Sequence, residues 1–384
     1  MVARRVDKKY DRIVVKVGSS TLTENGGKLN YTRIEHILHQ LVALKNKDRD
    51  VLLVTSGAIG AGMGEMGLKK KPRLIRKQQA AAAVGQGQLI ALYNKILAKY
   101  DEKGGQILMT ASDLKDRTRY LNAFNTLVTL LEYEIIPIIN ENDTVATEEI
   151  QFGDNDTLAA RVAGLVEADL LINLTDTEGL YDGDPAVDGE DINLISCVEK
   201  INPEIEKVAG GEGSRVGTGG MYTKIEAARI ATESGITMFI GPGYREDIIP
   251  EAVTMLEENK GFSLGTTFLP VADALPKRKQ WFCFNLDSKG SLIIDDGAEN
   301  ALLNCGKSLL PGGIIEVQKK FQRGDLVNIK NKKREVIAKG LVNYSAGEIR
   351  QIRGHHSREI YDILGFINQE EVLHRDNMVI LKCE

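Results

Sequence analysis

Apolar runs and helical stripes alternate along the first 260 residues of the chain. Runs typical of buried strands lie at residues 13–17, 51–54, 107–109, 135–139, 170–174 and 236–240. Between them, apolar residues recur three and four positions apart, as along residues 34–42, 89–97 and 158–166, which is typical of amphipathic helices. This alternation predicts an α/β domain in which a mostly parallel sheet carries helices on both faces.

The pattern changes near Gly261. Residues 262–276 contain no helical stripe and are interrupted by Pro270 and Pro276. Beyond them the strand signals are short and rich in turn residues, at 291–294, 314–317, 326–329, 336–342 and 378–381. We therefore expect a first domain over 1–261, a linker over 262–276 and a small β-rich domain over 277–384.

Length and composition agree with a two-domain globular protein. The chain has 384 residues, of which 42% are hydrophobic and 27% charged. It contains no apolar run long enough to span a membrane, and residues 1–10 do not resemble a secretory signal. The four cysteines are scattered, which favours a reduced cytoplasmic protein without structural zinc.

The net charge of −5 is unevenly distributed. Residues 275–384 carry 18 basic and 14 acidic side chains, a net charge of +4, whereas residues 1–274 carry 31 and 40, a net charge of −9. The basic C-terminal part, with the run Lys330-Asn331-Lys332-Lys333-Arg334, allows an RNA-binding function. A solvated surface and a charged hairpin turn are the alternative explanations.

Small and polar residues follow four of the predicted strands. The segments are KVGSS at 16–20, TSGAIGAG at 55–62, NEND at 140–143 and TDTEGLY at 175–181. Ligands of an open parallel sheet bind beyond the carboxyl ends of its strands. Each segment alone is compatible with an ordinary turn, but the four together predict one convergent cleft.

Lys16 lies within an apolar strand signal, so its ammonium group must reach solvent or a buried anion. Gly18 follows it, and a residue without a side chain lets an anion approach backbone N–H groups. A phosphate beside Lys16 fits this pattern. Ser56 and Gly57, at the end of the next strand, offer a second set of donors.

Two segments dense in carboxamides and carboxylates indicate an amino-acid-like ligand. Asn140 and Asp143 belong to the first, and Asn155 and Asp156 belong to the second, Gly153-Asp154-Asn155-Asp156. Acids can hold the ammonium group of a zwitterion, while amides and backbone N–H groups hold its carboxylates. A long surface loop is the alternative, because Asn and Asp are common turn formers.

A glycine-rich loop over residues 217–224 opens a predicted helix, and Lys224 lies in the first turns of that helix. Helix N-termini favour phosphate through their N–H groups and dipole, although a flexible linker can have a similar composition. A second segment, 301–308, imitates a phosphate-binding P-loop. We reject it because a helical segment precedes it and Pro311 follows it.

These segments, in this order and spacing, resemble those of the glutamate 5-kinases in the amino acid kinase family. The resemblance covers residues 1–260 and implies the three-layer α/β sandwich of that family. Residues 277–370 resemble a PUA domain through the segments at 295–298, 308–311 and 323–325. Asp182 departs from the family pattern, which has Thr or Ser there.

The resemblance implies ATP-dependent phosphorylation of the γ-carboxylate of L-glutamate to γ-glutamyl phosphate, the first step of proline biosynthesis. It also implies Mg²⁺, a cytoplasmic location, homo-oligomers (dimer or tetramer) and inhibition by proline, whereas the metal ligands stay unassigned. Two alternatives remain: another amino acid kinase with a different acyl acceptor, and an RNA-binding protein acting through the PUA-like domain.

The resemblance also implies roles for individual residues. Lys16 and Lys224 would be catalytic, with Asp156 orienting them. The residues that would bind glutamate are Ser56, Gly57, Asp143, Asn155 and Asn140. Those that would bind the nucleotide are Lys16, Gly18, Thr175, Asp176, Thr218, Gly219, Gly220, Met221 and Lys224.

Overall fold

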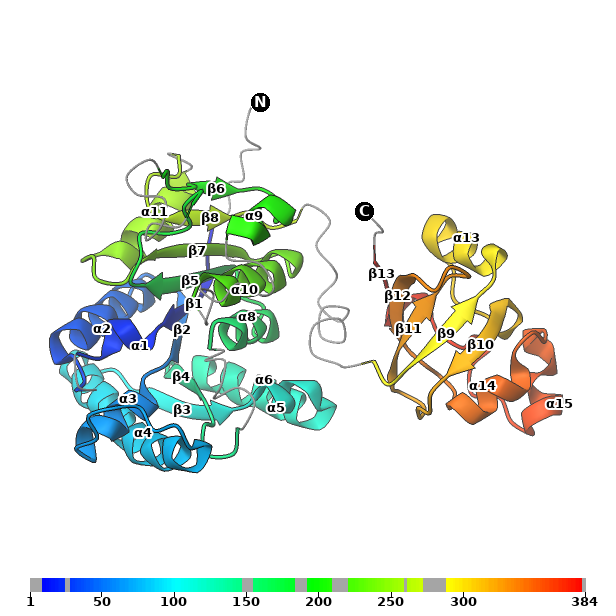
Figure 1. Cartoon of the computed structure of the whole chain (residues 1–384), viewed down its shortest axis with the longest axis horizontal. Helices are drawn as coiled ribbons and strands as arrows, with labels where there is room; N and C mark the ends of the chain where they lie inside the picture. Colours follow the sequence, from blue (N-terminus) through cyan, green and yellow to red (C-terminus); the bar gives the residue numbers. More distant parts are fainter. Residues whose placement is uncertain are drawn as a thin grey trace. The chain divides into compact units, whose positions relative to one another are not determined.

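The structure is a computed structural model that describes residues 9–24, 28–146, 155–183, 192–208, 220–258, 261–271 and 288–381. The chain divides into two compact units, Met1–Ala274 and Leu275–Glu384 (Figure 1). None of the helices in these described ranges is both long and apolar enough to cross a lipid bilayer.

The first unit is built on one mostly parallel sheet, as predicted. Its strands lie in the order β3-β4-β2-β1-β5-β7-β8-β6. Neighbouring strands are parallel, except that β8 runs antiparallel to β7. The strands are β1 (Arg12–Val17), β2 (Asp50–Thr55), β3 (Gly104–Met109), β4 (Ile136–Glu141), β5 (Leu170–Thr175), β6 (Cys197–Val198), β7 (Thr237–Pro242) and β8 (Thr266–Phe268).

Helices cover both faces of this sheet (Figure 1). One apolar core lies against α2 (Tyr31–Lys45), α4 (Ile75–Leu97) and α11 (Ile248–Glu258). The other lies against α5 (Ala111–Lys115), α6 (Arg117–Glu132), α8 (Asn155–Leu165) and α10 (Met221–Glu233). The remaining helices of this unit are α1 (Ser19–Leu22), α3 (Ala58–Glu65), the 3₁₀ helix η1 (Ala98–Tyr100) and α9 (Pro203–Val208).

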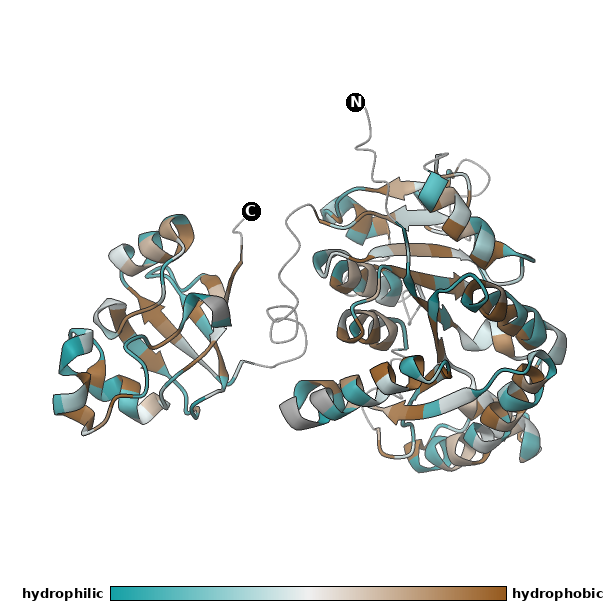
Figure 2. Cartoon of the chain, turned by 180° about the vertical axis from the view of Figure 1, so that it is seen from behind, coloured by the Kyte–Doolittle hydropathy of each residue, from teal (hydrophilic) through white to brown (hydrophobic). Residues whose placement is uncertain are grey.

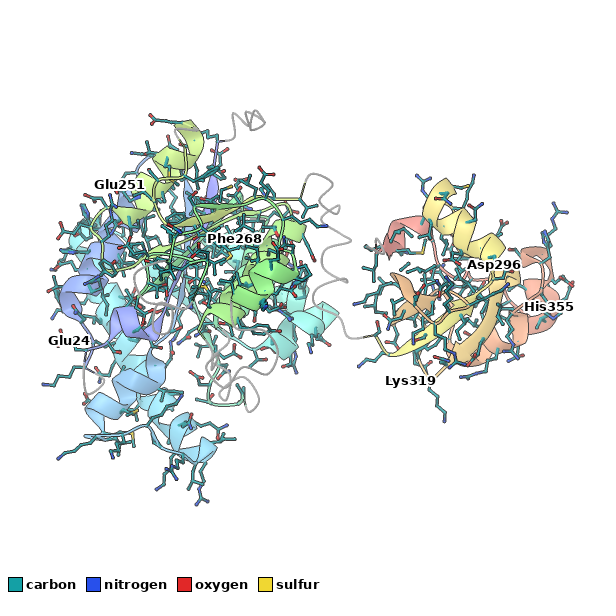
Figure 3. All side chains as sticks on the ribbon, turned by 45° about the horizontal axis from the view of Figure 1, so that its top comes forward. Glu24, Glu251, Phe268, Asp296, Lys319 and His355 are labelled. Atoms are coloured by element: carbon teal, nitrogen blue, oxygen red, sulfur yellow. The ribbon has the colours of Figure 1, made fainter. Side chains whose placement is uncertain are left out.

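Burial on both faces explains why the central strands read as continuous apolar runs. Val15 belongs to one core and Val14 to the other, because successive side chains of a strand point to opposite faces. Figure 2 shows the apolar character of these strands. Phe268 of β8, within the segment that we expected to be a linker, is fully buried among the packed side chains of Figure 3.

Helices α3 and α4 approach each other backbone to backbone. A Cβ atom on Gly62 would lie 1.7 Å from the Ala81 carbonyl oxygen, and one on Gly85 would lie 1.9 Å from the Ala58 carbonyl oxygen. Only glycine fits at such distances. This contact fixes α4 beside the carboxyl end of β2, from which α3 begins.

The second unit contains a separate, largely antiparallel sheet in the order β10-β9-β11-β12-β13. Its core is built from the strands and the helices that pack on them. The strands are β9 (Gly290–Ile294), β10 (Ile314–Gln318), β11 (Leu326–Lys330), β12 (Val336–Leu341) and β13 (Met378–Ile380), close to the predicted positions. The helices are α13 (Asp296–Cys305), α14 (Ala346–Ile352), α15 (Ile360–Leu364) and the 3₁₀ helices η2 (Pro311–Gly313), η3 (Ser357–Glu359) and η4 (Arg375–Asn377).

The segment that imitates a P-loop, residues 301–308, covers the end of α13 and the residues after it, with Gly306 in the left-handed conformation (φ +57°) at the helix C-cap. It follows a helix and does not open one, in agreement with our rejection of it. The basic run forms the hairpin turn between β11 and β12. Two of its cations are ion-paired, Lys332 with Asp296 at 2.6 Å and Arg334 with Glu316 at 3.9 Å.

Candidate active site

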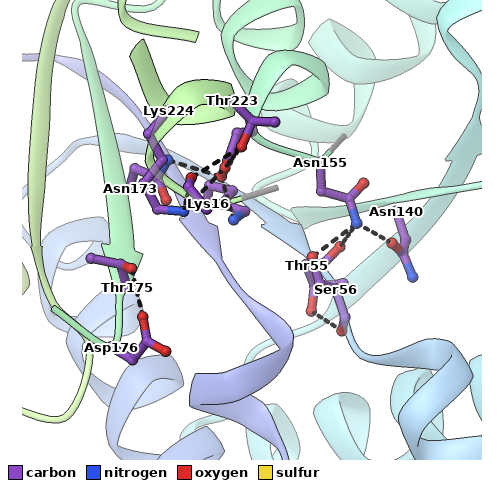
Figure 4. Close-up of polar contacts among 12 residues, drawn as sticks. Lys16, Thr55, Ser56, Asn140, Asn155, Asn173, Thr175, Asp176, Thr223 and Lys224 are labelled. Atoms are coloured by element: carbon purple, nitrogen blue, oxygen red, sulfur yellow. Dashed lines mark hydrogen bonds and ion pairs between the residues drawn. The ribbon is translucent and has the colours of Figure 1, made fainter. Parts of the chain in front are cut away.

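The carboxyl ends of four adjacent parallel strands carry the predicted polar residues. Across the sheet in the order β4, β2, β1 and β5, these ends present Asn140, Ser56, Lys16 and Thr175. Because neighbouring strands lie about 4.8 Å apart, the four ends span roughly 15 Å. One edge of the sheet therefore offers a continuous row of polar groups (Figure 4).

A buried ion cluster occupies the middle of this row. Asp156 Oδ1 forms an ion pair with Lys16 Nζ, and Asp156 Oδ2 lies 3.2 Å from Lys224 Nζ. The exposed fractions of Lys16, Asp156 and Lys224 are 6%, 3% and 9%. Two ammonium groups share this carboxylate, so the three side chains together carry a net positive charge, which favours an anionic ligand.

Local structure explains how these three residues meet. Asp156 lies in the first turn of α8 and Lys224 in the first turns of α10. These two helices pack against each other, and α8 also packs on β1 and α10 on β7. Thr223 Oγ1 also donates a hydrogen bond to Asp156 Oδ2, at 2.8 Å. Burial opposes the ionisation of Asp156, but the two lysines and the hydrogen bonds outweigh it, and the pKa of this carboxyl lies well below its usual range.

A chain of amides lies beside the ion cluster, with Asn155 at the start of α8, Asn140 on β4 and Gln86 on α4. Asn155 Nδ2 donates to Ser56 Oγ at 2.8 Å and to Asn140 Oδ1 at 3.3 Å. Asn140 Nδ2 in turn donates to Gln86 Oε1 at 2.7 Å, which connects the chain to α4. Asn155 Oδ1 is buried and has no hydrogen-bond partner within the described residues.

Two glycines keep the backbone close to these groups. Gly57 caps the N-terminus of α3 with φ +94°, a conformation that favours glycine. Gly18 follows β1, and a Cβ atom there would lie 3.6 Å from Lys16 Nζ. A side chain at Gly18 would thus restrict access to the ammonium group.

Asp143 lies in the turn that follows β4 and is half-buried. Burial raises the pKa of its carboxyl to about 6, and the positive charge of Lys71 opposes part of that rise. Asp143 is therefore a carboxylate that an ammonium ligand would convert fully to its ionised form.

The other end of the row is at β5. Thr175 is buried and its hydroxyl donates to Asp176 Oδ1 at 3.1 Å, while Asp176 itself is exposed. Gly220 and Met221 begin α10 beside Lys224. Thr218 and Gly219, which we also predicted to bind the nucleotide, lie outside the described residues.

Three residues of the site were not assigned from the sequence. Asn173 on β5 donates from Nδ2 to Asp156 Oδ1 at 3.0 Å, and Thr223 and Gln86 make the contacts given above. Asn173 carried a usable signal, because it is an amide inside the apolar run of β5. Gln86 carried none, since its position depends on how α4 packs.

Comparisons with known proteins give concordant results. Residues 11–242 match the amino acid kinase family, and residues 290–364 match the PUA domain. A glutamate 5-kinase of Caldanaerobacter subterraneus subsp. tengcongensis is 48% identical over 371 residues, which cover 97% of this chain and 98% of that protein. A glutamate 5-kinase of Moorella thermoacetica is 50% identical over 370 residues, 96% of each chain. One of Carboxydothermus hydrogenoformans is 48% identical over 379 residues, 98% of this chain and 100% of that protein.

Proposed function

The chain belongs to the glutamate 5-kinases of the amino acid kinase family, and we propose that its row of polar strand ends binds L-glutamate and ATP end to end. It phosphorylates the γ-carboxylate of glutamate to γ-glutamyl phosphate, the first step of proline biosynthesis. The observation that carries the site assignment is the buried cluster of Lys16, Asp156 and Lys224.

The chemistry of this reaction is limited by charge repulsion. A carboxylate is already ionised at neutral pH, so its attack on the γ-phosphorus needs no general base. A new bond forms between the carboxylate oxygen and the γ-phosphorus, and the bond from that phosphorus to the β–γ bridging oxygen breaks to release ADP. The protein must therefore position two anions and neutralise the charge between them.

Lys16 and Lys224 supply that neutralisation. In our proposal Lys16, at the centre of the row, stabilises the transferring phosphoryl group, and Lys224 stabilises the charge that moves to the leaving group. Asp156 keeps both ammonium groups at one place, because each of its carboxylate oxygens binds one of them. The net positive charge of these three side chains favours a triphosphate over a neutral ligand.

The amide chain and the turn after β4 form the proposed glutamate end. Ser56 and the backbone at Gly57, which begins α3, are donors for a carboxylate of glutamate. Asn140 and Asn155 lie within hydrogen-bonding distance of each other and bind its remaining polar atoms. Asp143 accepts the ammonium group. Thr175, Asp176 and the start of α10 form the proposed nucleotide end.

A kinase of this family uses ATP together with a metal ion, and we propose Mg²⁺. Both oxygens of Asp156 already accept hydrogen bonds, and the described ranges contain no group of three His, Cys, Asp or Glu side chains that could hold a metal. These residues fit a metal ion held mainly by the ATP phosphates, as Mg²⁺ commonly is. When bound there, Mg²⁺ neutralises charge on the β and γ oxygens.

Several finer properties are part of the proposal and rest on family membership. They are a cytoplasmic location, assembly into dimers or tetramers, and inhibition by proline. Sedimentation of the purified chain and a proline titration of its activity test the last two directly.

A substrate panel tests the proposed function. Glutamate, aspartate and N-acetylglutamate are each incubated with MgATP, and ADP release and hydroxylamine-trapped acyl phosphate are measured in parallel. We expect both signals with glutamate and little of either with the other two acids. Equal or greater turnover with aspartate or N-acetylglutamate would reject glutamate as the acceptor.

A further inference from the structure

Asn173 is an amide in an otherwise mostly apolar row of the sheet. The strand register places Ile139, Val54, Lys16, Asn173 and Ile240 side by side across β4, β2, β1, β5 and β7. All five are buried, and the three apolar members belong to the core under α8 and α10. Residues paired in register on parallel strands point to the same face, so Asn173 lies on the side of the sheet that Lys16 shares with Asp156.

The amide of Asn173 binds the carboxylate that joins the two lysines. Its Nδ2 lies 3.0 Å from Asp156 Oδ1, the same oxygen that pairs with Lys16 (Figure 4). Asp156 Oδ2 receives the equivalent support from Thr223 Oγ1 at 2.8 Å. Each carboxylate oxygen is thus held by one ammonium group and by one neutral donor.

Stability alone does not explain a buried amide at this position. Asn173 is 1% exposed, and its Oδ1 has no hydrogen-bond partner in the part of the chain that the structure describes. The reverse orientation of the amide would bring that oxygen against the Asp156 carboxylate, so the observed orientation is the favourable one. An apolar side chain would avoid leaving a buried carbonyl oxygen without a partner.

We infer that Asn173 is a positioning residue for phosphoryl transfer, an inference that rests on the proposed function. A triphosphate that enters the site competes with Asp156 for the hydrogen bonds and ion pairs of the Lys16 and Lys224 ammonium groups. The neutral donors of Asn173 and Thr223 are not drawn away by the phosphates, and they hold the carboxylate in place while the ammonium groups turn to their substrate. Asn173 therefore acts on the transition state through Asp156 and Lys16 without touching either substrate.

The test is Asn173→Leu, which keeps the branched shape of the side chain and removes both polar atoms. We expect kcat to fall roughly tenfold or more, because a hydrogen bond to a charged group is lost. The KM values for glutamate and ATP should stay within about twofold, since Asn173 binds neither. The melting temperature should stay close to that of the wild type, because the loss of the hydrogen bond to Asp156 is offset by the removal of a buried carbonyl oxygen without a partner.

Ile240→Leu is the matched control, because Ile240 is the in-register neighbour of Asn173 and its replacement repacks the same row without removing a donor. It should leave kcat within about twofold of the wild type, since volume-conserving core changes are well tolerated. If Asn173→Leu also retains wild-type kcat, or loses kcat only together with thermal stability, the positioning role is overturned. A wild-type chain without glutamate-dependent turnover would overturn the proposed function itself, and the inference with it.

A second variant, Asn173→Asp, decides the matter if Asn173→Leu does not fold. The charged groups around this position are Asp156 on α8, Lys16 on β1 and Lys224 on α10. An ionised carboxylate cannot donate to Asp156 and repels it. Because Lys16 and Lys224 favour the ionised form of a carboxyl at this position, we expect kcat of Asn173→Asp to fall by about tenfold or more at pH 7–8, while the KM values for glutamate and ATP stay within about twofold. A kcat within about twofold of the wild type would overturn the inference.

Discussion

Replacing Asp156 with asparagine separates two roles that the ion cluster could have. Asp156→Asn removes the negative charge with which the buried lysines Lys16 and Lys224 both pair. If Asp156 serves to hold the lysines, the free protein must lose stability and turnover. If it served to bind the nucleotide, ATP affinity would fall.

The expected size of the stability loss follows from burial. Lys16, Asp156 and Lys224 are 6%, 3% and 9% exposed, so solvent screens the pairs little. Removing one partner of a buried ion pair costs about 3–5 kcal/mol. In a domain of this size that corresponds to a fall in melting temperature of roughly 6–20 °C.

The nucleotide should recover part of this loss. Asp156→Asn makes the site more positive, so we expect ATP to bind the variant at least as tightly as the wild type. A ligand at about 100 times its Kd stabilises the folded state by about 2.7 kcal/mol. MgATP should therefore raise the melting temperature of the variant by at least as much as that of the wild type, while kcat falls by about a hundredfold.

The stability that Asp156 contributes depends on pH, and the lowered pKa of its carboxyl determines the direction of that dependence. The unfolded carboxyl titrates near pH 4, so the stabilisation is fully present above about that pH and is lost as the pH falls toward the folded value. Melting should therefore be compared at pH 7–8. The difference between wild type and variant should shrink below about pH 4.

Glu257→Gln is the matched control for this experiment. It breaks the pair between Arg49 Nη2 and Glu257 Oε2, 2.9 Å apart, whose side chains are 10% and 24% exposed. This variant should lose stability while its kcat and its ATP-induced shift stay as in the wild type. Differential scanning fluorimetry with and without MgATP measures the melting temperatures of the wild type, Asp156→Asn and Glu257→Gln. An Asp156→Asn protein that melts like the wild type, or that binds ATP more weakly, would refute the reasoning.

Two further predictions concern the glutamate end and the helix that supports it. The KM for glutamate should rise below about pH 6, because Asp143, whose pKa is raised to about 6, must be ionised to hold an ammonium group. Asp143→Asn should have a high KM for glutamate that no longer changes across that pH range. A wild-type KM that stays constant from pH 5 to 8 would contradict the assignment. In α4, Gly85→Ala should destabilise the protein strongly, since its Cβ would lie 1.9 Å from a backbone oxygen. Gly87→Ala, whose Cβ would have nothing within 4 Å, should stabilise the protein by about 0.5–1 kcal/mol. Denaturant unfolding measures both free energies, and equal effects would show that the contact between α3 and α4 yields more easily than we expect.

The sequence predicted the parts of this protein that depend on local pattern. The central strands were predictable because burial on both faces leaves near-continuous apolar runs, and β1 was recognisable although it contains Lys16. The polar strand ends were predictable because a parallel sheet gathers them at one edge. Strand β8 was missed, since three residues beside β7 carry too little pattern to be told from a linker.

The parts that were not predictable depend on contacts between distant segments. Asn173 could be read as a polar residue in an apolar run, but only the register between β1 and β5 places it beside Lys16 and under Asp156. Gln86 reaches Asn140 only because glycines bring α4 against α3. Such contacts need the three-dimensional arrangement, because no spacing along the chain encodes them.

The most direct test of the central claim is the turnover of Lys16→Met, which keeps an unbranched side chain of similar length and removes the ammonium group. The claim is that a buried ammonium held by Asp156 stabilises the transferring phosphoryl group. We expect kcat for glutamate to fall by about a hundredfold or more while the KM for glutamate stays within about twofold. A variant whose kcat stays within about threefold of the wild type would contradict the account.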